Sequence, residues 1–206
     1  MNKIKTVFSH KIFKIFLWVF LFLIVSFLIL VIVRIPHAIE TQKIDDQVVK
    51  IHSTKIHLSD VMGENLPPDP GIMKDQTVQG VDANHNGIRD DVELAIFKKY
   101  PNSVKTRAVL LQYALVLQME ITQPFDSTVT ATEIAREESR SFACVGSIVP
   151  VSKNDIDEIT SYLHFVEKLQ FNTNDRISAQ TIFFKNVRSY SDLPDGCDID
   201  LARLPN

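Results

Sequence analysis

The sequence predicts an all-α protein, in which one N-terminal transmembrane helix precedes a bundle of about five helices. Three observations support this fold class. An uninterrupted apolar run lies near the N-terminus, apolar residues recur at helical spacing from Asp90 onward, and prolines separate the helical segments. The expected parts are a basic cytoplasmic tail (1–14), the transmembrane helix (15–33), a linker with a proline-rich segment (34–70) and a helical calcium-loop domain (71–206).

The apolar run extends from Ile15 to Val33 and contains one hydroxyl, Ser26, and no charged side chain. A helix of this length spans roughly 28 Å, at about 1.5 Å per residue, which matches the hydrocarbon core of a bilayer. Four lysines precede the run, whereas only Arg34 follows it before acidic residues begin. The positive-inside rule therefore predicts a single-pass protein of the bacterial inner membrane, with a cytoplasmic N-terminus and a periplasmic domain.

A cleaved signal peptide is the alternative interpretation of this run. The apolar region of a signal peptide usually has about 7–15 residues and ends in a small-x-small cleavage site. The run here is longer, and the candidate site Pro36-His37-Ala38 has proline where a small residue is required. We therefore expect an uncleaved anchor, and a mature N-terminus near Ile39 would contradict that expectation.

Little regular structure is predicted between the membrane helix and the bundle. Residues 55–58 (KIHL) match a short strand, and residues 59–63 match one capped helical turn that ends at Gly63. The following stretch, Leu66 to Gly71, reads LPPDPG. It is expected to be irregular, because proline has no amide hydrogen and restricts the residue before it.

Five helices are expected after this segment. The second of them, which Ser103 can cap, has apolar residues on two adjacent faces along its whole length, so we expect it to be the central helix of the bundle. Ser152 followed by Asp155 resembles a capping box before the fourth. The predicted helices cover residues 90–100, 104–122, 130–145, 155–171 and 174–188.

One motif in the sequence carries recognisable chemistry. Residues 82–93 read DANHNGIRDDVE and match the EF-hand loop pattern D-x-[DN]-x-[DN]-G-x5-E at every specified position. Calcium binds six to eight hard oxygen atoms, and a loop wrapped around the ion offers alternate side chains. Gly87 allows the sharp turn, and Ile88 is expected to offer its backbone carbonyl. The expected side-chain ligands of a bound Ca²⁺ are Asp82, Asn84, Asn86, Asp90 and Glu93.

These twelve residues resemble the EF-hand-like loops of bacterial calcium proteins, including dockerin and thrombospondin type 3 loops. More loosely, DVMGENLPP, the loop and LLQYALVLQ are similar to a group of proteobacterial envelope proteins, a resemblance that implies no activity. Three departures exclude a calmodulin-type switch: no helix precedes the loop, no second loop pairs with it, and Arg89 stands where paired loops have an apolar residue. A lone loop with two asparagines is expected to bind calcium weakly, with a Kd on the order of 10⁻⁵ to 10⁻³ M. The alternative is a metal-free turn that caps a helix.

The chain has two cysteines, Cys144 and Cys197, and both lie in the part expected to be outside the cytoplasm. Disulfides persist in such oxidising spaces. A bridge between them would close a loop of about 54 residues and contribute roughly 4 kcal/mol in the chain-entropy model. Two unpaired thiols are the alternative.

The charge distribution narrows the classes of partner. The first 34 residues hold five of the 22 basic residues and none of the 25 acidic ones, so the remainder has a net charge of 17 minus 25, or −8. Such a domain is a poor nucleic-acid binder and suits cations or a basic partner, although the charge also serves solubility. No catalytic motif is found, and we expect no enzyme. The expected function is a membrane-anchored periplasmic calcium-binding structural or interaction protein. The alternative is an acidic immunity or inhibitor protein for a secreted toxin or enzyme, and either could have a protein partner in the envelope.

Overall fold

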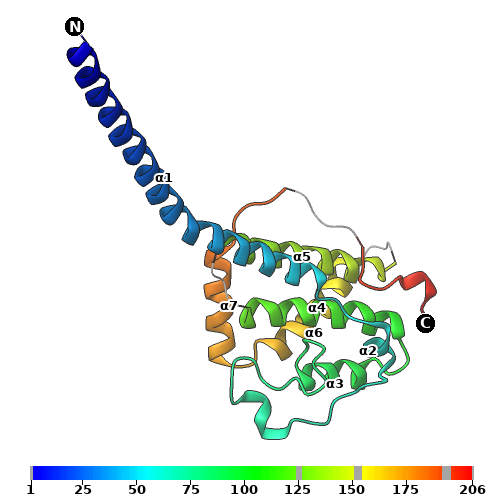
Figure 1. Cartoon of the computed structure of the whole chain (residues 1–206). Helices are drawn as coiled ribbons and strands as arrows, with labels where there is room; N and C mark the ends of the chain where they lie inside the picture. Colours follow the sequence, from blue (N-terminus) through cyan, green and yellow to red (C-terminus); the bar gives the residue numbers. More distant parts are fainter. Residues whose placement is uncertain (1, 124–126, 151–154, 192–195, 206) are drawn as a thin grey trace. The chain divides into compact units, whose positions relative to one another are not determined.

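The computed structural model describes residues 2–123, 127–150, 155–191 and 196–205 (Figure 1). The regular structure within these ranges is entirely helical, which confirms the predicted all-α class. The chain divides into two compact units, residues 1–46 and residues 47–206. The elements are α1 (Asn2–Ser53), α2 (Leu58–Met62), the 3₁₀ helix η1 (Gly71–Asp75), α3 (Asp90–Lys99), α4 (Val104–Thr122), α5 (Thr128–Ser147), α6 (Asp155–Gln170), α7 (Asn174–Asn186) and the 3₁₀ helix η2 (Leu201–Arg203).

Helix α1 contains the predicted membrane span and is long and apolar enough to cross a bilayer, with a mean hydropathy of 3.3 over its best 18-residue window. The helix continues past Val33 to Ser53, with Pro36 inside it, through residues that the sequence analysis treated as linker. Its last turns are amphipathic: Ile51 is buried in the core of the second unit, whereas Val49 is exposed. Burial of one apolar stripe accounts for the helical last turns of α1, whereas residues 34–43 of the helix are exposed.

The strand predicted over residues 55–58 is wrong, because the described residues offer no neighbouring strand to pair with it. The backbone N–H of Ile56 instead donates to Asp198 Oδ2 at 3.1 Å, and the Ile56 side chain is buried. Helix α2 follows at once, and Gly63 ends it as predicted, with a left-handed φ of 75°. Its N–H donates to the carbonyl of Asp60 at 3.1 Å, which satisfies one of the free carbonyls at the helix end.

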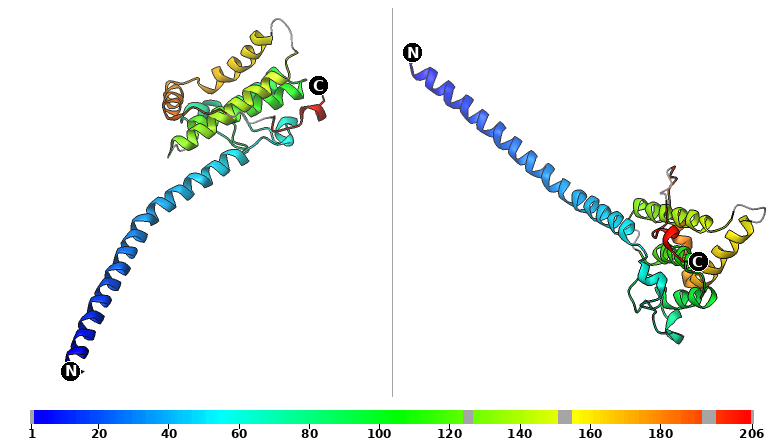
Figure 2. Two further views of the ribbon diagram at one scale, coloured as in Figure 1. Left: turned by 90° about the horizontal axis from the view of Figure 1, so that it is seen from above. Right: turned by 90° about the vertical axis from the view of Figure 1, so that its right-hand side faces the viewer.

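Helix α4 is the centre of the bundle, as its apolar faces predicted. It packs against α2, α3, α5, α6 and α7, and 17 of its 19 residues are buried (Figures 1 and 2). The side chain of Ser103 accepts a hydrogen bond from the N–H of Thr106 and caps the first turn. Because α4 is buried on all sides, the neighbouring helices pack their apolar faces against it from every direction. The sites described below therefore lie on or next to α4.

Two of the surrounding helices, α5 and α7, begin at hydroxyl caps. The side chain of Ser127 accepts from the N–H of Thr130, so α5 starts two residues earlier than predicted. The side chain of Thr173 accepts from the N–H of Arg176 and starts α7. The capping box predicted at Ser152 lies outside the described residues. Helix α7 ends at Asn186, just before the predicted boundary at residue 188.

Candidate metal centre

The EF-hand-like loop lies between η1 and α3, and its last residues, Asp90 to Glu93, form the first turn of α3. Two residues turn the backbone through the left-handed region: His85, with φ 58°, and Gly87, with φ 85°. A Cβ atom on Gly87 would also lie only 2.7 Å from Leu115 Cδ1 of α4. Position 6 of the loop therefore requires glycine both for its conformation and for its close approach to the central helix.

The first half of the loop is folded around the carboxylate of Asp82. Its Oδ1 accepts from the N–H of Asn86 at 3.2 Å, and its Oδ2 accepts from the N–H of Gly87 at 3.0 Å. The amide oxygens of the two asparagines also point at backbone donors. Asn84 Oδ1 accepts from Asn86 at 3.3 Å, and Asn86 Oδ1 accepts from the N–H of Ile88 at 2.9 Å. The alternation of the motif thus directs its oxygens toward the inside of the turn.

The second half of the loop supplies two buried carboxylates. Glu93 is 1% exposed, and its Oε2 accepts hydrogen bonds of 3.0 Å from the side-chain amides of both Asn84 and Asn86. Asp90 is fully buried; its Oδ1 accepts from the N–H of Ala83 at 3.0 Å, and its Oδ2 has no hydrogen-bond partner among the described residues. Among the described residues, no lysine or arginine acts on either acid, and the basic side chain that acts on Asp90 is His85.

Burial has the expected electrostatic effect on these two acids. Desolvation raises the pKa of Glu93 to about 7, against the opposing effect of the hydrogen bonds from Asn84 and Asn86. Desolvation also raises the pKa of Asp90, and the charge of Asp82 adds to the rise, whereas the hydrogen bond from Ala83 opposes it. A nearby cation would remove this cost in both cases.

The donor set fits a hard divalent cation, provided that amide oxygens take part. The described residues contain no cluster of three or more histidine, cysteine, aspartate or glutamate side chains arranged to hold a metal ion. A site here therefore depends on Asn84 and Asn86, and calcium accepts amide and backbone carbonyl oxygens as readily as carboxylates. Rotating either amide about its last bond would exchange the nitrogen that faces Glu93 for an oxygen. Ile88 is fully buried, and its predicted role as a carbonyl ligand stays a prediction.

Arg89 fixes the loop to the end of α6. The guanidinium is fully buried and forms a bidentate ion pair with Asp91, through hydrogen bonds of 2.8 and 2.7 Å. It also donates to the backbone carbonyls of Gln170 at 3.0 Å and Leu169 at 3.1 Å. These are carbonyls at the C-terminal end of a helix, where positive charge is favourable. The residue that departs from the paired EF-hand pattern thus ties the loop to the bundle.

Arg176 performs the same function for the segment before the loop. From the first turn of α7, its buried guanidinium donates to the carbonyls of Lys74 at 2.6 Å, Thr77 at 3.1 Å and Val78 at 3.0 Å. It also pairs with Asp75 Oδ1 at 2.7 Å. On the other side of the loop, the Asn84 amide donates to the carbonyl of Asn65 at 2.9 Å. The EF-hand-like loop is therefore attached to the bundle through Arg89, and the segment before the loop is attached through Arg176.

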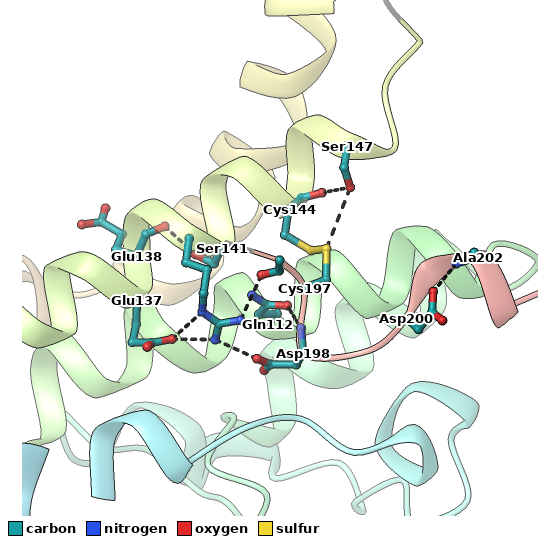
Figure 3. Close-up of a disulfide and its surroundings, with 12 residues drawn as sticks. Gln112, Glu137, Glu138, Ser141, Cys144, Ser147, Cys197, Asp198, Asp200 and Ala202 are labelled. Atoms are coloured by element: carbon teal, nitrogen blue, oxygen red, sulfur yellow. Dashed lines mark hydrogen bonds and ion pairs between the residues drawn. A yellow bond between two sulfur atoms is a disulfide. The ribbon is translucent and has the colours of Figure 1, made fainter. Parts of the chain in front are cut away.

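Cys144 of α5 and Cys197 form a disulfide, with their Cα atoms 5.3 Å apart (Figure 3). The bridge positions the next residue, Asp198. The Asp198 carboxylate pairs with Arg140 at 2.7 Å, and its N–H donates to Gln112 Oε1 at 2.8 Å. Burial disfavours the charged guanidinium of Arg140, but the charges and hydrogen bonds of Asp198 and Glu137 together outweigh burial and raise the pKa of Arg140. The disulfide thus holds a buried ion pair in place beneath the C-terminal segment.

Sequence reasoning identified the loop but missed these arginines, because an arginine that binds backbone carbonyls leaves no spacing pattern. Only Arg89 stood out, through its position in the motif.

A cavity of about 600 Å³ also lies at the start of α4, lined by Ser103, Lys105, Thr106, Tyr162 and residues of η2. Its described lining includes neither a carboxylate nor a histidine.

Comparisons of the chain with protein-family models, with curated proteins and with solved structures find no match.

Proposed function

We propose that this protein is a membrane-anchored calcium-binding protein of the bacterial envelope, in which calcium stabilises the fold of the outer domain. The observation that carries the proposal is the pair of buried acids, Asp90 and Glu93, at the end of a loop whose alternate side chains present oxygens inward. Asp82, Asn84, Asn86, Asp90 and Glu93 would hold the ion, with the carbonyl of Ile88. Bound calcium would neutralise the acids that burial penalises.

The attachments of the loop favour a stabilising function over a switching one. Arg89 and Arg176 hold the loop and the segment before it on α6 and α7, and Asn84 contacts the chain at Asn65. A signalling loop requires an element that moves between two states, whereas this loop has fixed contacts on both sides. Calcium would therefore complete an existing structure, and its effect should appear as resistance to unfolding.

The proposed location rests on α1 and on the distribution of charge. The apolar helix is long enough to cross a membrane, and lysines gather before it. The disulfide agrees with an oxidising space such as the periplasm. Alkaline phosphatase fused after Asn206 should therefore be active in intact bacteria, and green fluorescent protein at the same position should stay dark. The reverse pattern would place the domain in the cytoplasm and overturn the proposed location.

Calcium should raise the melting temperature of the full-length protein in detergent micelles. For a Kd of about 10⁻⁴ M, about 5 mM calcium should raise it by roughly 5 °C. The Glu93→Gln variant keeps the size of the side chain and loses its charge, so it should melt near the wild-type temperature in chelator and gain nothing from calcium. Glu64→Gln, at an exposed glutamate outside the loop, is the matched control and should respond like the wild type. An equal calcium effect on Glu93→Gln would contradict the proposed site.

A further inference from the structure

A second group of acids centres on the buried Glu120, on elements that do not form the EF-hand-like loop. Glu120 of α4, Glu138 of α5 and Glu167 of α6 interact electrostatically with one another. Glu120 is fully buried. Its Oε2 accepts one long hydrogen bond from Gln180 Nε2 of α7 at 3.4 Å, and its Oε1 has no hydrogen-bond partner among the described residues.

No basic side chain compensates Glu120 from the elements packed around it. The groups that act on it are Glu138 and Glu167, which are like charges, and the neutral amide of Gln180. Tyr113, two turns before Glu120 on the same face of α4, donates to Glu167 Oε1 at 2.8 Å and stays neutral. The one histidine beside the cluster, His164, lies 3.9 Å from Glu167 on the solvent side, with its side chain 72% exposed. Glu120 therefore faces acids across the interior without a counter-charge from these neighbours.

Two ionised carboxylates without a cation are costly in the interior of a protein, and a shared proton removes most of that cost. Desolvation raises the pKa of Glu138 to about 7, and the charge of Glu167 adds to the rise. Desolvation, with the charge of Glu138, also raises the pKa of Glu120 well above its ordinary value. The charge of Glu138 opposes the ionisation of Glu120, so a proton held by either carboxyl relieves the repulsion between them.

We propose that Glu120 and Glu138 share a proton at neutral pH and form a pH-responsive element that holds α4 against α5 and α7. When the pair loses that proton, two like charges remain buried between the helices. The packing around Glu120 then loosens, and the bundle becomes less stable.

The direction of the pH effect follows from the raised pKa values. An unfolded glutamate has its ordinary pKa of about 4.5, so the folded protein binds more protons than the unfolded chain between that value and about 7. Stability from this pair is therefore fully present below pH of about 4.5 and is lost as the pH rises through about 7. The bundle should be more stable in weak acid than in weak base.

Thermal unfolding of the full-length protein in detergent micelles tests this inference. The tyrosine signal in near-ultraviolet circular dichroism reports the domain, because all four tyrosines lie between residues 100 and 190, whereas the single tryptophan, Trp18, lies in the apolar run of α1. The wild-type melting temperature should fall by about 5 °C between pH 5.5 and pH 8.5. Glu120→Gln and Glu138→Gln should each make that fall smaller, chiefly by raising the melting temperature at the higher pH, and the part of the fall that remains comes from Glu93. Glu93 adds the same slope to every protein compared, so the difference between variants isolates the pair.

The control is Asp157→Asn, which removes a carboxylate from the exposed side of α6 and should keep the wild-type pH dependence. Glu138 is only partly buried, so Glu138→Gln should fold and can be used for the test if Glu120→Gln does not fold. If the glutamine variants that fold keep the wild-type slope, or become less stable at pH 8.5, the proposed proton sharing is wrong.

Discussion

Replacing Arg176 with methionine should lower the free energy of unfolding by about 3–5 kcal/mol, which corresponds to a fall in melting temperature of roughly 10 °C. Methionine approximates the volume of the arginine side chain but donates no hydrogen bond. The change would leave Asp75 and the carbonyls of Lys74, Thr77 and Val78 without the guanidinium that they now share. Carbonyls that lose a buried partner bear a desolvation cost that the wild-type contacts remove.

Urea unfolding of the full-length protein in micelles measures this loss. Arg188→Met is the matched control, because Arg188 is exposed just beyond α7 and its only hydrogen bond found here uses the backbone N–H, at 3.0 Å to Thr132. That control should change the free energy of unfolding by less than about 0.5 kcal/mol. A loss below about 1 kcal/mol for Arg176→Met would mean that the segment over residues 74–78 stays folded without its arginine.

Replacing both cysteines with serine should destabilise the domain by about 4 kcal/mol. Most of this loss in the free energy of unfolding is entropic, because the bridge closes the loop between Cys144 and Cys197, which are 53 residues apart. The structure adds a local part, because Asp198 would no longer be held next to Arg140 and the N–H of Ile56. The urea midpoint should therefore fall for the double variant, and its value should not depend on reductant.

Reductant supplies the complementary measurement on the wild type. Reduction of the bridge should lower the wild-type urea midpoint to about that of the double serine variant, since both proteins then lack the same cross-link. A wild-type midpoint that is the same with and without reductant would show that the bridge contributes nothing to stability, or that it does not form in the protein as isolated.

Several elements were predictable because a local rule specifies each of them. The apolar stretch of α1 follows from a run of nineteen residues that are all apolar except Ser26, α4 from two adjacent apolar faces, and the end of α2 from the glycine at position 63. The EF-hand-like motif was recognised because the spacing of its polar residues is recorded directly in the order of residues, and calcium binding there stays a prediction. In each case neighbouring residues alone determine the local structure.

Features that depend on distant contacts were not predictable in this way. The strand proposed over residues 55–58 failed because its partner is a side chain, Asp198, about 140 residues away. Arg176 binds carbonyls of an irregular segment, which any sequence could offer. Glu120 lies on a helix that otherwise reads as apolar, and nothing in the sequence indicates that acids from two other helices face it.

The most direct test of the account is an isothermal calorimetric titration of the full-length protein with calcium in chelator-treated detergent solution. We expect one calcium ion per chain, a Kd on the order of 10⁻⁵ to 10⁻³ M, and no binding heat for Asp82→Ala or Glu93→Gln. Magnesium, which requires a smaller and more rigid oxygen shell, should bind more weakly than calcium. The absence of calcium heat from folded wild-type protein, or equal heat from the two variants, would contradict the proposed metal centre.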